Sequence, residues 1–263
     1  MNPDTAVRGV PAWMERMASV DLDELFDIAD LQTRRDRKYL LPVDEAWALL
    51  DGTAARVLEI DGLRSFDYES IYFDTASRDS YLGSARRRPR RFKVRTRTYL
   101  DTQECLLEVK VRDHRGNTVK HRRPYDLGQR HHLTAAGAAF VTEVEAAAPF
   151  VALLGAALEV RYHRSTFVLS STSDRVTMDR CISWAGIGSP SLQVRGLAII
   201  ETKSSGPPTE VDRKLWQSGH RPRSISKYCT GLAAVDPSLP SNKWHRVLER
   251  HVLPNLGFDG SRR

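Results

Sequence analysis

The stretch RRFKVRTRTY, residues 90–99, gathers side chains that could bind phosphate. In a β-strand the side chains alternate between two faces, so every cation from Arg91 to Arg97 would share one face. Phe92, Val94 and the other residues of their parity would share the opposite face. Like charges crowded on one face of a sheet destabilise it. Either water solvates this basic face, or a strongly anionic ligand lies against it.

The same bias recurs in other alternating stretches. ECLLEVKVRD places Glu108 and Lys110 on one face, and Lys120 lies in the expected hairpin partner TVKHRRPYD. IIETKS places Glu201 and Lys203 on one face. Arginine grips phosphate oxygens with a planar fork, lysine adds a point charge, and carboxylates are hard ligands for Mg²⁺ or Mn²⁺. The pattern favours a site for a chain of phosphates, with Glu201 as the first candidate for a metal ligand and Glu108 as the second.

The composition agrees with an anionic partner. The chain has 263 residues, and 40 Lys and Arg against 33 Asp and Glu give a formal net charge of +7. Such an excess is typical of proteins that meet nucleic acid, a membrane surface or a phosphorylated ligand. The three cysteines are scattered and include no C-x-x-C pair, so we expect neither a structural zinc site nor a disulfide framework.

We expect a cytoplasmic protein without a transmembrane segment. The N-terminus lacks the basic-then-apolar pattern of a signal peptide. The longest uncharged run, residues 146–158, contains Pro149 and Gly155 and is shorter than the roughly 20 residues that cross a bilayer.

Most of the chain has the pattern of strands joined by hairpin turns. The alternating stretches predict about eight strands, with helices inserted among them and appended after them. We therefore expect an α+β protein built on an antiparallel β-barrel, in which one face of every strand lines a common lumen. Its expected parts are an N-terminal arm with a short helix over residues 1–30, the barrel domain over 31–235, and a C-terminal helix and tail over 236–263.

The alternative is a sheet whose charged face lies in water, which is the usual state of an antiparallel sheet. One basic strand would fit that alternative, but several strands with the same bias favour an inward basic face. In the cluster RRRPRR, residues 86–91, Arg86 to Arg88 and Arg90 are interpreted separately, as a solvated turn broken by Pro89.

Taken together, these stretches resemble the VTC domain, the catalytic domain of the vacuolar transporter chaperone polyphosphate polymerase and its bacterial relatives. That domain is one of the triphosphate tunnel metalloenzymes, which are CYTH-like proteins. The similar stretches are DRKYLL, YFDT, KVRTRTY, LLEVKV, GNTVKHR, RYHRSTF, DRVTMD, IIETKS and SISKY, in family order over about residues 33–232. The resemblance implies an antiparallel tunnel barrel and ATP-dependent polyphosphate synthesis with Mn²⁺ or Mg²⁺.

The resemblance also implies roles for individual residues. The residues implied to act in catalysis by binding phosphates are Lys38, Arg95, Arg97, Lys110 and Lys227. Those implied to bind or assist the substrate are Lys120, Tyr162, Arg164, Arg175, Lys203 and Ser226, while Glu201 would hold the metal. Lys227 also has an independent basis: with Ser224 as an N-cap it would lie in the first turn of a helix, where backbone N–H groups favour anions.

One departure from the wider superfamily bears on the reaction. Hydrolytic members begin with Glu-x-Glu-x-Lys, whereas here Arg34 and Asp36 precede Lys38. Hydrolysis needs an activated water. A chain-end phosphate is already an anion, so transfer to it needs only positioning and neutralisation of charge. A carboxylate-poor site therefore favours an ATP:polyphosphate phosphotransferase.

Two other functions stay open. One is a tunnel triphosphatase that hydrolyses inorganic triphosphate or a nucleotide triphosphate, and the other is a non-catalytic binder of polyphosphate or nucleic acid. If the protein makes polyphosphate from ATP, export of the polymer would need a separate membrane partner.

Overall fold

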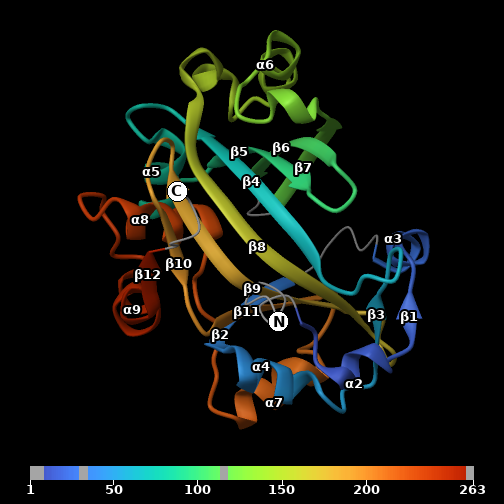
Figure 1. Cartoon of the computed structure of the whole chain (residues 1–263). Helices are drawn as coiled ribbons and strands as arrows, with labels where there is room; N and C mark the ends of the chain where they lie inside the picture. Colours follow the sequence, from blue (N-terminus) through green and yellow to red (C-terminus); the bar gives the residue numbers. More distant parts are fainter. Residues whose placement is uncertain (1–8, 30–34, 113–117, 259–263) are drawn as a thin grey trace. The chain divides into compact units, whose positions relative to one another are not determined.

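The computed structural model describes residues 9–29, 35–112 and 118–258 (Figure 1). This part of the chain forms eight strands of seven residues or more and four shorter ones. The long strands are β2 (Arg35–Pro42), β4 (Phe66–Asp74), β5 (Phe92–Tyr99), β6 (Glu104–Arg112), β7 (Thr118–Pro124), β8 (Gly155–Leu169), β9 (Arg175–Gly186) and β11 (Leu197–Ser204). The short strands are β1 (Ser19–Val20), β3 (Ala55–Leu58), β10 (Ser191–Val194) and β12 (Leu256–Phe258). The prediction of about eight strands is confirmed for the long ones.

The strands pair in the order β12-β10-β9-β8-β4-β5-β6-β7, while β11 joins β9 to β2 and β3 joins β8 to β1. The registers among β2, β11 and β9, and among β4, β5, β6 and β7, are antiparallel, whereas β1 runs parallel to β3. Across the described residues this order does not return on itself. The predicted α+β fold with an antiparallel sheet is confirmed, and its strand order is open rather than a closed ring.

Two compact units divide the chain between them. Unit 1 comprises the described residues within 1–66, 162–182 and 194–224, and unit 2 those within 67–161, 183–193 and 225–263. The long strands β8 and β9 contribute residues to both units. The three-part division expected along the sequence stays a prediction.

In unit 1 the apolar side of the strands packs against three helices. These are α2 (Ala12–Glu15), α4 (Val43–Leu50) and α7 (Glu210–Gln217), and their apolar side chains share a buried core with strand residues such as Met178 and Ile200. Because side chains alternate along a strand, the neighbours of Ile200 in β11 lie on the opposite side of the sheet.

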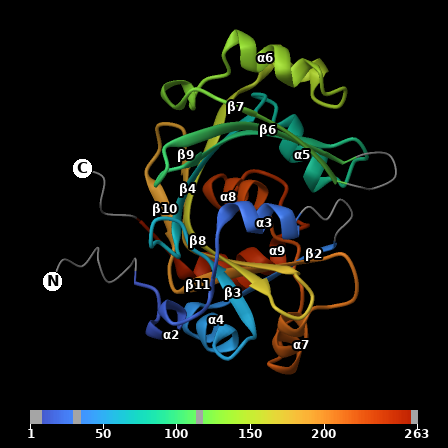
Figure 2. The same ribbon diagram turned by 90° about the vertical axis from the view of Figure 1, so that its right-hand side faces the viewer.

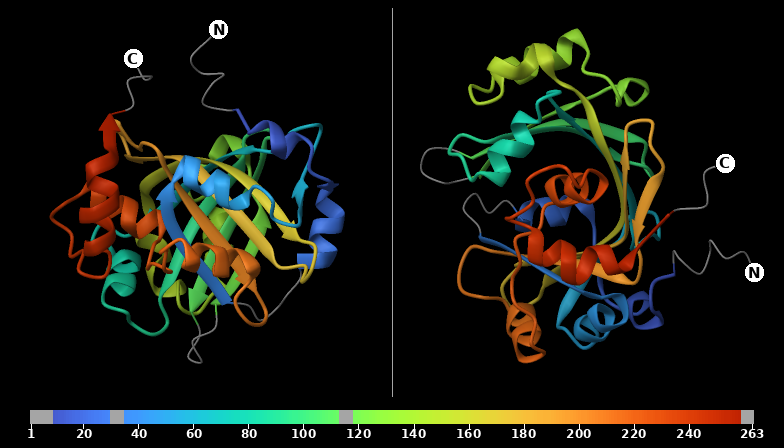
Figure 3. Two further views of the ribbon diagram at one scale, coloured as in Figure 1. Left: turned by 90° about the horizontal axis from the view of Figure 1, so that it is seen from below. Right: turned by 90° about the vertical axis from the view of Figure 1, so that its left-hand side faces the viewer.

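In unit 2 two helices lie on opposite faces of the strands (Figures 2 and 3). Helix α6 (Ala135–Thr142) contributes Phe140 to a core that contains Val94 of β5 and Val109 of β6. Helix α8 (Lys227–Val235) lies on the other face, where the side chain just before its first residue is hydrogen-bonded to β5. The strand face that the sequence marks as basic is therefore the face toward α8.

The ends of the chain contain more regular structure than the sequence pattern predicts. The expected short helix is present as α3 (Leu22–Ala29), but α2 and β1 also form in the stretch before it. Near the C-terminus α9 (His245–Val247) continues into a π-helical turn at Leu248–Val252. Between these ends, α5 (Asp79–Ala85) connects β4 to β5. No helix in the described ranges is long and apolar enough to cross a membrane.

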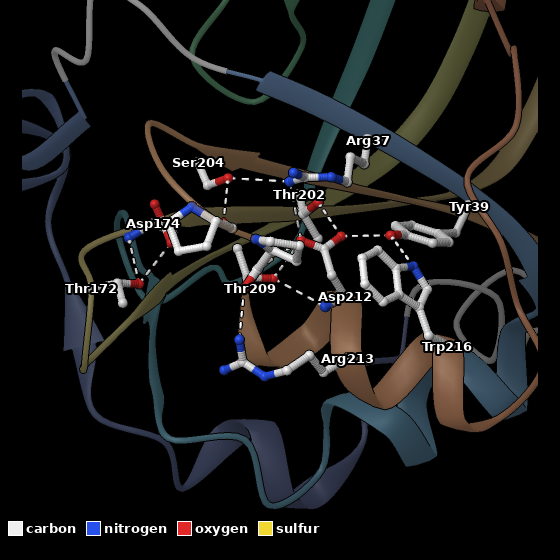
Figure 4. Close-up of polar contacts among 12 residues, drawn as sticks. Arg37, Tyr39, Thr172, Asp174, Thr202, Ser204, Thr209, Asp212, Arg213 and Trp216 are labelled. Atoms are coloured by element: carbon white, nitrogen blue, oxygen red, sulfur yellow. Dashed lines mark hydrogen bonds and ion pairs between the residues drawn. The ribbon is translucent and has the colours of Figure 1, made fainter.

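Asp212 joins α7 to the strands of unit 1 from a fully buried position (Figure 4). Its carboxylate accepts hydrogen bonds from the Tyr39 hydroxyl at 2.6 Å and the Thr202 hydroxyl at 2.7 Å. It also accepts from the Thr209 backbone N–H at 2.8 Å, while the Thr209 hydroxyl accepts from the Asp212 N–H, which completes a capping box. The Arg37 guanidinium lies 3.4 Å away and supplies the opposite charge.

Asp212→Asn should destabilise the protein by about 2–4 kcal/mol, because an amide has one acceptor oxygen and no charge for these donors. Urea unfolding of the two proteins measures the difference. Asp27→Asn on the exposed side of α3 is the matched control and should stay within about 0.5 kcal/mol of wild type. Equal unfolding free energies for Asp212→Asn and wild type would show that the network contributes nothing.

Candidate functional site

Strand β5 separates its side chains into two faces, as the sequence predicts. Phe92, Val94 and the other residues of that parity are buried, while Arg95, Arg97 and the other cations are half-buried. The buried face packs in the core with α6, so the cations must lie on the opposite face. The alternation predicted for this strand is confirmed.

Three lysines lie directly opposite one another on adjacent strands of unit 2. Lys93 of β5 is in register with Lys110 of β6, which is in register with Lys120 of β7. Three like charges in one cross-strand row destabilise a sheet unless something negative neutralises them. The Lys93 ammonium donates to the Ser226 hydroxyl at 2.9 Å, and that contact brings no negative charge. We call these residues the lysine row.

The next row along the same face contains an internal counter-ion. Arg95 donates from Nε and Nη2 to the Glu108 carboxylate at 2.7 and 2.5 Å, and from Nη1 to the Tyr72 hydroxyl at 2.8 Å. The Lys120 ammonium lies 3.3 Å from the other Glu108 oxygen. Burial opposes ionisation of Glu108, yet the charges of Arg95, Arg97 and Lys120 hold its pKa well below the usual range. These contacts favour a counter-ion role for Glu108 over the metal role that the sequence suggested.

The pKa of the Tyr72 phenol reflects the positive charge of this face. Burial raises the pKa of its phenol, but the charges of Arg95, Arg97, Lys93 and Lys227 outweigh that effect and lower the pKa. The ring stacks on Tyr228 of α8 with the centroids 4.8 Å apart. Tyr228 in turn donates a hydrogen bond to the carboxylate of Asp74. The aromatic pair therefore fixes the first turn of α8 beside the basic face.

Lys227 lies in the first turn of helix α8, as expected, but the helix begins two residues later than predicted because its N-cap differs. The cap is Ser226, whose hydroxyl accepts from the Cys229 N–H at 3.2 Å; the assignment of Ser224 was wrong. The true cap lies two residues later because the backbone is still extended at Ser226. Lys227 is consequently the first helical residue, and its charge adds to the helix end that favours anions.

Unit 1 places its own charged residues on the face opposite the helices. In the register of β2 with β11, Lys38 is opposite Glu201 and Asp36 is opposite Lys203. The Glu201 carboxylate lies 3.8 Å from the Lys38 ammonium and 3.5 Å from the Lys203 ammonium. On the other side of β11, Arg175 of β9 is opposite Lys203. The structure thus brings together four residues that the sequence placed in the site, Lys38, Arg175, Glu201 and Lys203, with Asp36 beside them.

Arg164 and Tyr162 lie in the same unit, on β8. The Arg164 guanidinium makes a buried bidentate pair with Asp179, with hydrogen bonds of 2.6 and 2.9 Å. Its Cζ lies 5.3 Å from the centroid of the Tyr162 ring. Both contacts fix the guanidinium in one orientation, so this arginine is preorganised and an anion would have to approach it from the side not occupied by Asp179.

Lys203 is the most strongly perturbed cation of unit 1. Burial lowers its pKa to about 7, against the attraction of Glu201 and with further lowering by Arg164 and Arg175. Near neutral pH this lysine is therefore close to the midpoint of its titration. A phosphate ligand would favour the protonated form, since it supplies the negative charge that the buried ammonium lacks.

Glu201 is the residue that could hold a divalent cation in unit 1. Over the described ranges no three His, Cys, Asp or Glu side chains lie close enough to hold a metal by themselves. Mg²⁺ commonly uses one or two carboxylates and takes its other ligands from substrate phosphates and water. A single carboxylate among phosphate-binding cations fits that mode, with the neighbouring lysines as competitors for its charge.

Several residues of these faces escaped the sequence analysis. Lys93 was placed on the basic face of β5 but not among the site residues, although the alternation that marks Arg95 marks it equally. Asp179 shares a face with Arg175 but was not assigned a role, and Tyr72 carries no such signal. Both roles depend on the exact register with an adjacent strand, which places Arg95 opposite Tyr72 and Arg164 within reach of Asp179. Arg34 and the hairpin turn at residues 114–117 lie outside the described residues.

Comparisons with known proteins identify one family. The model of the VTC domain matches residues 33–236. No curated protein matches the chain.

The solved structures that match are distant in sequence. A putative adenylyl cyclase, HpAC1 from Hippeastrum, described as having a dominant triphosphatase activity, is 17% identical with a TM-score of 0.47, over 74% of this chain and 93% of that one. A putative adenylate cyclase from Bacillus halodurans is 12% identical with a TM-score of 0.44, over 66% and 81%. PH1819 from Pyrococcus horikoshii OT3 is 11% identical with a TM-score of 0.44, over 74% and 94%.

Glu108→Gln should lower stability, because it leaves Arg95 and Lys120 without their counter-ion. We expect a loss of about 3 kcal/mol in the unfolding free energy at neutral pH, measured by urea unfolding without phosphate. Glu104→Gln, exposed on the same strand, is the control and should change stability little. If Glu108→Gln unfolded at the same free energy as wild type, and only the stabilisation by added Mg²⁺ or Mn²⁺ were lost, the counter-ion role of Glu108 would be wrong.

Lys203 should make stability depend on pH in a defined direction. Its folded pKa of about 7 lies below the 10.5 of an unperturbed lysine, so the unfolded state binds more protons between these values and stability rises with pH. The unfolding free energy of wild type minus that of Lys203→Met should therefore increase from about pH 7 to about pH 9, measured by urea unfolding with a metal chelator present. Lys214→Met on α7 is the control. A difference that stayed constant over this range would contradict the lowered pKa.

Proposed function

The chain belongs to the VTC domain family, and we propose that it is a polyphosphate polymerase that extends inorganic polyphosphate from ATP. The observation that carries the proposal is the lysine row, Lys93, Lys110 and Lys120, flanked on the same face by Arg95 and Arg97. Glu108 balances part of this charge through Lys120, and the positive charge that remains makes the binding of a chain of phosphates across the row favourable. The face therefore fits an extended polyanion better than a single phosphate group.

The proposed reaction needs little from the protein beyond positioning and charge. An anionic oxygen at the end of the polyphosphate chain attacks the γ-phosphorus of ATP, a new P–O bond forms, and the bond to the β,γ-bridging oxygen breaks. The electron pair of the broken bond stays on the bridging oxygen, which leaves with ADP. Because the attacking oxygen is already an anion, no proton has to be removed from it. The cations of β5, β6 and β7 would bind the repelling phosphates and hold acceptor and donor in line.

The state of the carboxylates favours transfer over hydrolysis. Glu108 is engaged by Arg95 and Lys120, and Asp179 by Arg164. The lowered pKa of Glu108 makes it a poor base for activating water, and the arginine fork occupies both oxygens of Asp179. This argument supports a phosphotransferase, while the triphosphatase and the non-catalytic binder remain the other outcomes of the test below.

A divalent cation, Mn²⁺ or Mg²⁺, belongs to the proposal. Glu201 would hold it together with phosphate oxygens of the substrate, and the bound ion would supply further neutralisation of phosphate charge. Lys38 and Lys203, on either side of Glu201, would contact the same phosphates. The tunnel that the family implies, the cytoplasmic location and a separate membrane partner for export also stay predictions.

Incubation of the purified protein with ATP and Mn²⁺ or Mg²⁺ tests the function through its products. We expect ADP and a phosphoanhydride polymer, with one polymer phosphate formed for each ADP, resolved by ³¹P NMR and gel electrophoresis. Lys110→Met should reduce kcat/KM about a hundredfold, because it interrupts the lysine row. The control Lys214→Met removes a lysine of α7 and should keep activity. Free phosphate without polymer would establish a triphosphatase, and the absence of turnover would leave a binder.

A further inference from the structure

The connection from α5 to β5 carries five arginines within six residues. We call Arg86, Arg87, Arg88, Arg90 and Arg91 the arginine cluster; all belong to unit 2. Residues 86–90 are exposed and Arg91 is half-buried. The sequence analysis interpreted the cluster apart from Arg91 as a solvated turn, and the proposed reaction makes no use of the cluster.

The cluster holds more positive charge than its surroundings neutralise. Of its five arginines, Arg90 has an ion pair within the described part of the chain, with Glu145 at 3.3 Å, and both side chains are largely exposed. The nearby carboxylate of Asp79 is occupied by the hydroxyls of Thr75 and Ser77 at 2.6 and 2.8 Å. Those hydrogen bonds are the main cause of its lowered pKa, and Arg88 contributes less.

The connection has a defined conformation. Arg87 and Arg90 adopt left-handed backbone angles, with φ of 54° and 52°, which cost an L-residue about 1 kcal/mol each. Hydrogen bonds hold the turn between them: the Arg88 N–H donates to the Gly83 carbonyl at 2.9 Å, and Arg91 Nη1 donates to the Arg88 carbonyl at 3.0 Å. Glycine or asparagine would fit these two backbone positions better, so arginine brings charge there at a conformational cost.

The cluster continues the basic face of β5. Arg91 has the same parity as Lys93, and a Cβ placed on Gly83 of α5 would lie 3.6 Å from the Arg91 Cβ, so Arg91 faces α5. Lys243 also contacts α5, because its ammonium donates a hydrogen bond to the Ser84 carbonyl at 2.9 Å. Burial lowers the pKa of Lys243, and the nearby charges of Arg91, Lys93 and Arg87 lower it further. Cations therefore follow one another from Arg97 to the arginine cluster at steps of about 6.6–7 Å along the strand.

We infer that the arginine cluster and Lys243 form an outer binding surface for inorganic polyphosphate, continuous with the lysine row. The surface holds the part of a long chain that extends beyond the reacting phosphates. This inference takes its ligand class from the proposed function, but it concerns binding outside the site of transfer. A chain of a few phosphates would occupy the lysine row alone, and only a long one would reach both.

The residues around the cluster favour polyphosphate over nucleic acid. Proteins that bind single-stranded nucleic acid place aromatic rings where successive bases can stack. The rings that border this surface, Tyr81, Phe92 and Trp244, are all buried, with at most 4% of their surface exposed. Because these rings are buried under the connection, none of them can stack on a nucleic-acid base. The surface therefore offers a ligand positive charge without a stacking platform.

The test compares two triple variants that remove equal charge. In Arg87→Gln/Arg88→Gln/Arg91→Gln, the Kd for long-chain polyphosphate should rise about tenfold at low salt, and the slope of log Kd against log salt should fall by about two. The Kd for inorganic triphosphate should stay unchanged. The control Arg16→Gln/Arg213→Gln/Arg221→Gln removes three exposed arginines of unit 1 and should bind both ligands like wild type. Calorimetry without ATP or metal gives the Kd values, and thermal melting verifies that each variant is folded.

Two other binding results overturn the inference. If both triple variants weaken long-chain binding equally, the effect is one of net charge and the surface is not a site. The second such result is that single-stranded RNA of equal charge binds as tightly as polyphosphate and loses that binding in the cluster variant. In that case the assigned ligand class is wrong. Because the measurement needs no turnover, a wild type that makes no polymer but shows the expected length dependence rejects the proposed polymerase and keeps the surface.

Discussion

The buried ion pair between Arg95 and Glu108 is the interaction on which the basic face of unit 2 depends. Strand β5 must bury Phe92 and Val94 to hold α6, and the alternation of side chains then forces its cations together on the other face. Without a negative charge inside, their repulsion would push the strands apart unless water or a bound anion screened it. Glu108 meets Arg95 at hydrogen-bond distance and Lys120 at 3.3 Å, so one carboxylate steadies two strands. It cancels only part of the charge, and the lysine row beside it keeps its attraction for anions.

Glu108 and Asp179 are held in a different way from Glu201, and the difference separates their roles. Glu108 and Asp179 accept short hydrogen bonds of 2.5–2.9 Å from arginine forks, a geometry that fixes guanidinium groups firmly. Glu201 instead meets two ammonium groups at 3.5 and 3.8 Å, which is ion-pair contact beyond the usual hydrogen-bond length. Lysine is also the cation whose charge burial removes most readily, as the pKa of about 7 for Lys203 illustrates. Under the proposed function, Glu108 and Asp179 position arginines, whereas Glu201 is the carboxylate for which a metal would compete.

The sequence was sufficient for features that repeat along the chain and insufficient for features that join distant parts of it. Alternation located the long strands and assigned Arg95, Lys110 and Glu201 to faces, because the two-residue period is local. It could not tell that Glu108 is a counter-ion, since that depends on which strand lies beside β6. The N-cap of α8 was misplaced because serines at both candidate positions, Ser224 and Ser226, satisfy the same preference. Asp212 lies 173 residues from Tyr39 along the chain, a separation over which no local pattern carries information.

A polymerase must hold its product and still let it advance by one phosphate in each cycle, and the two kinds of row on β5 fit these opposed needs. The ammonium groups of the lysine row are point charges on flexible stems, and they can exchange one phosphate for the next with little change in energy. Arg95, by contrast, has a guanidinium fixed by Glu108 and Tyr72, and Arg97 has its Cζ 5.6 Å from the ring centroid of Tyr68. A fixed fork recognises a phosphate in one orientation, which suits the step at which donor and acceptor must be in line. Under the proposed function the lysines would therefore carry the chain and the arginines would set its register, a division of labour that follows from the different stiffness of the two cations.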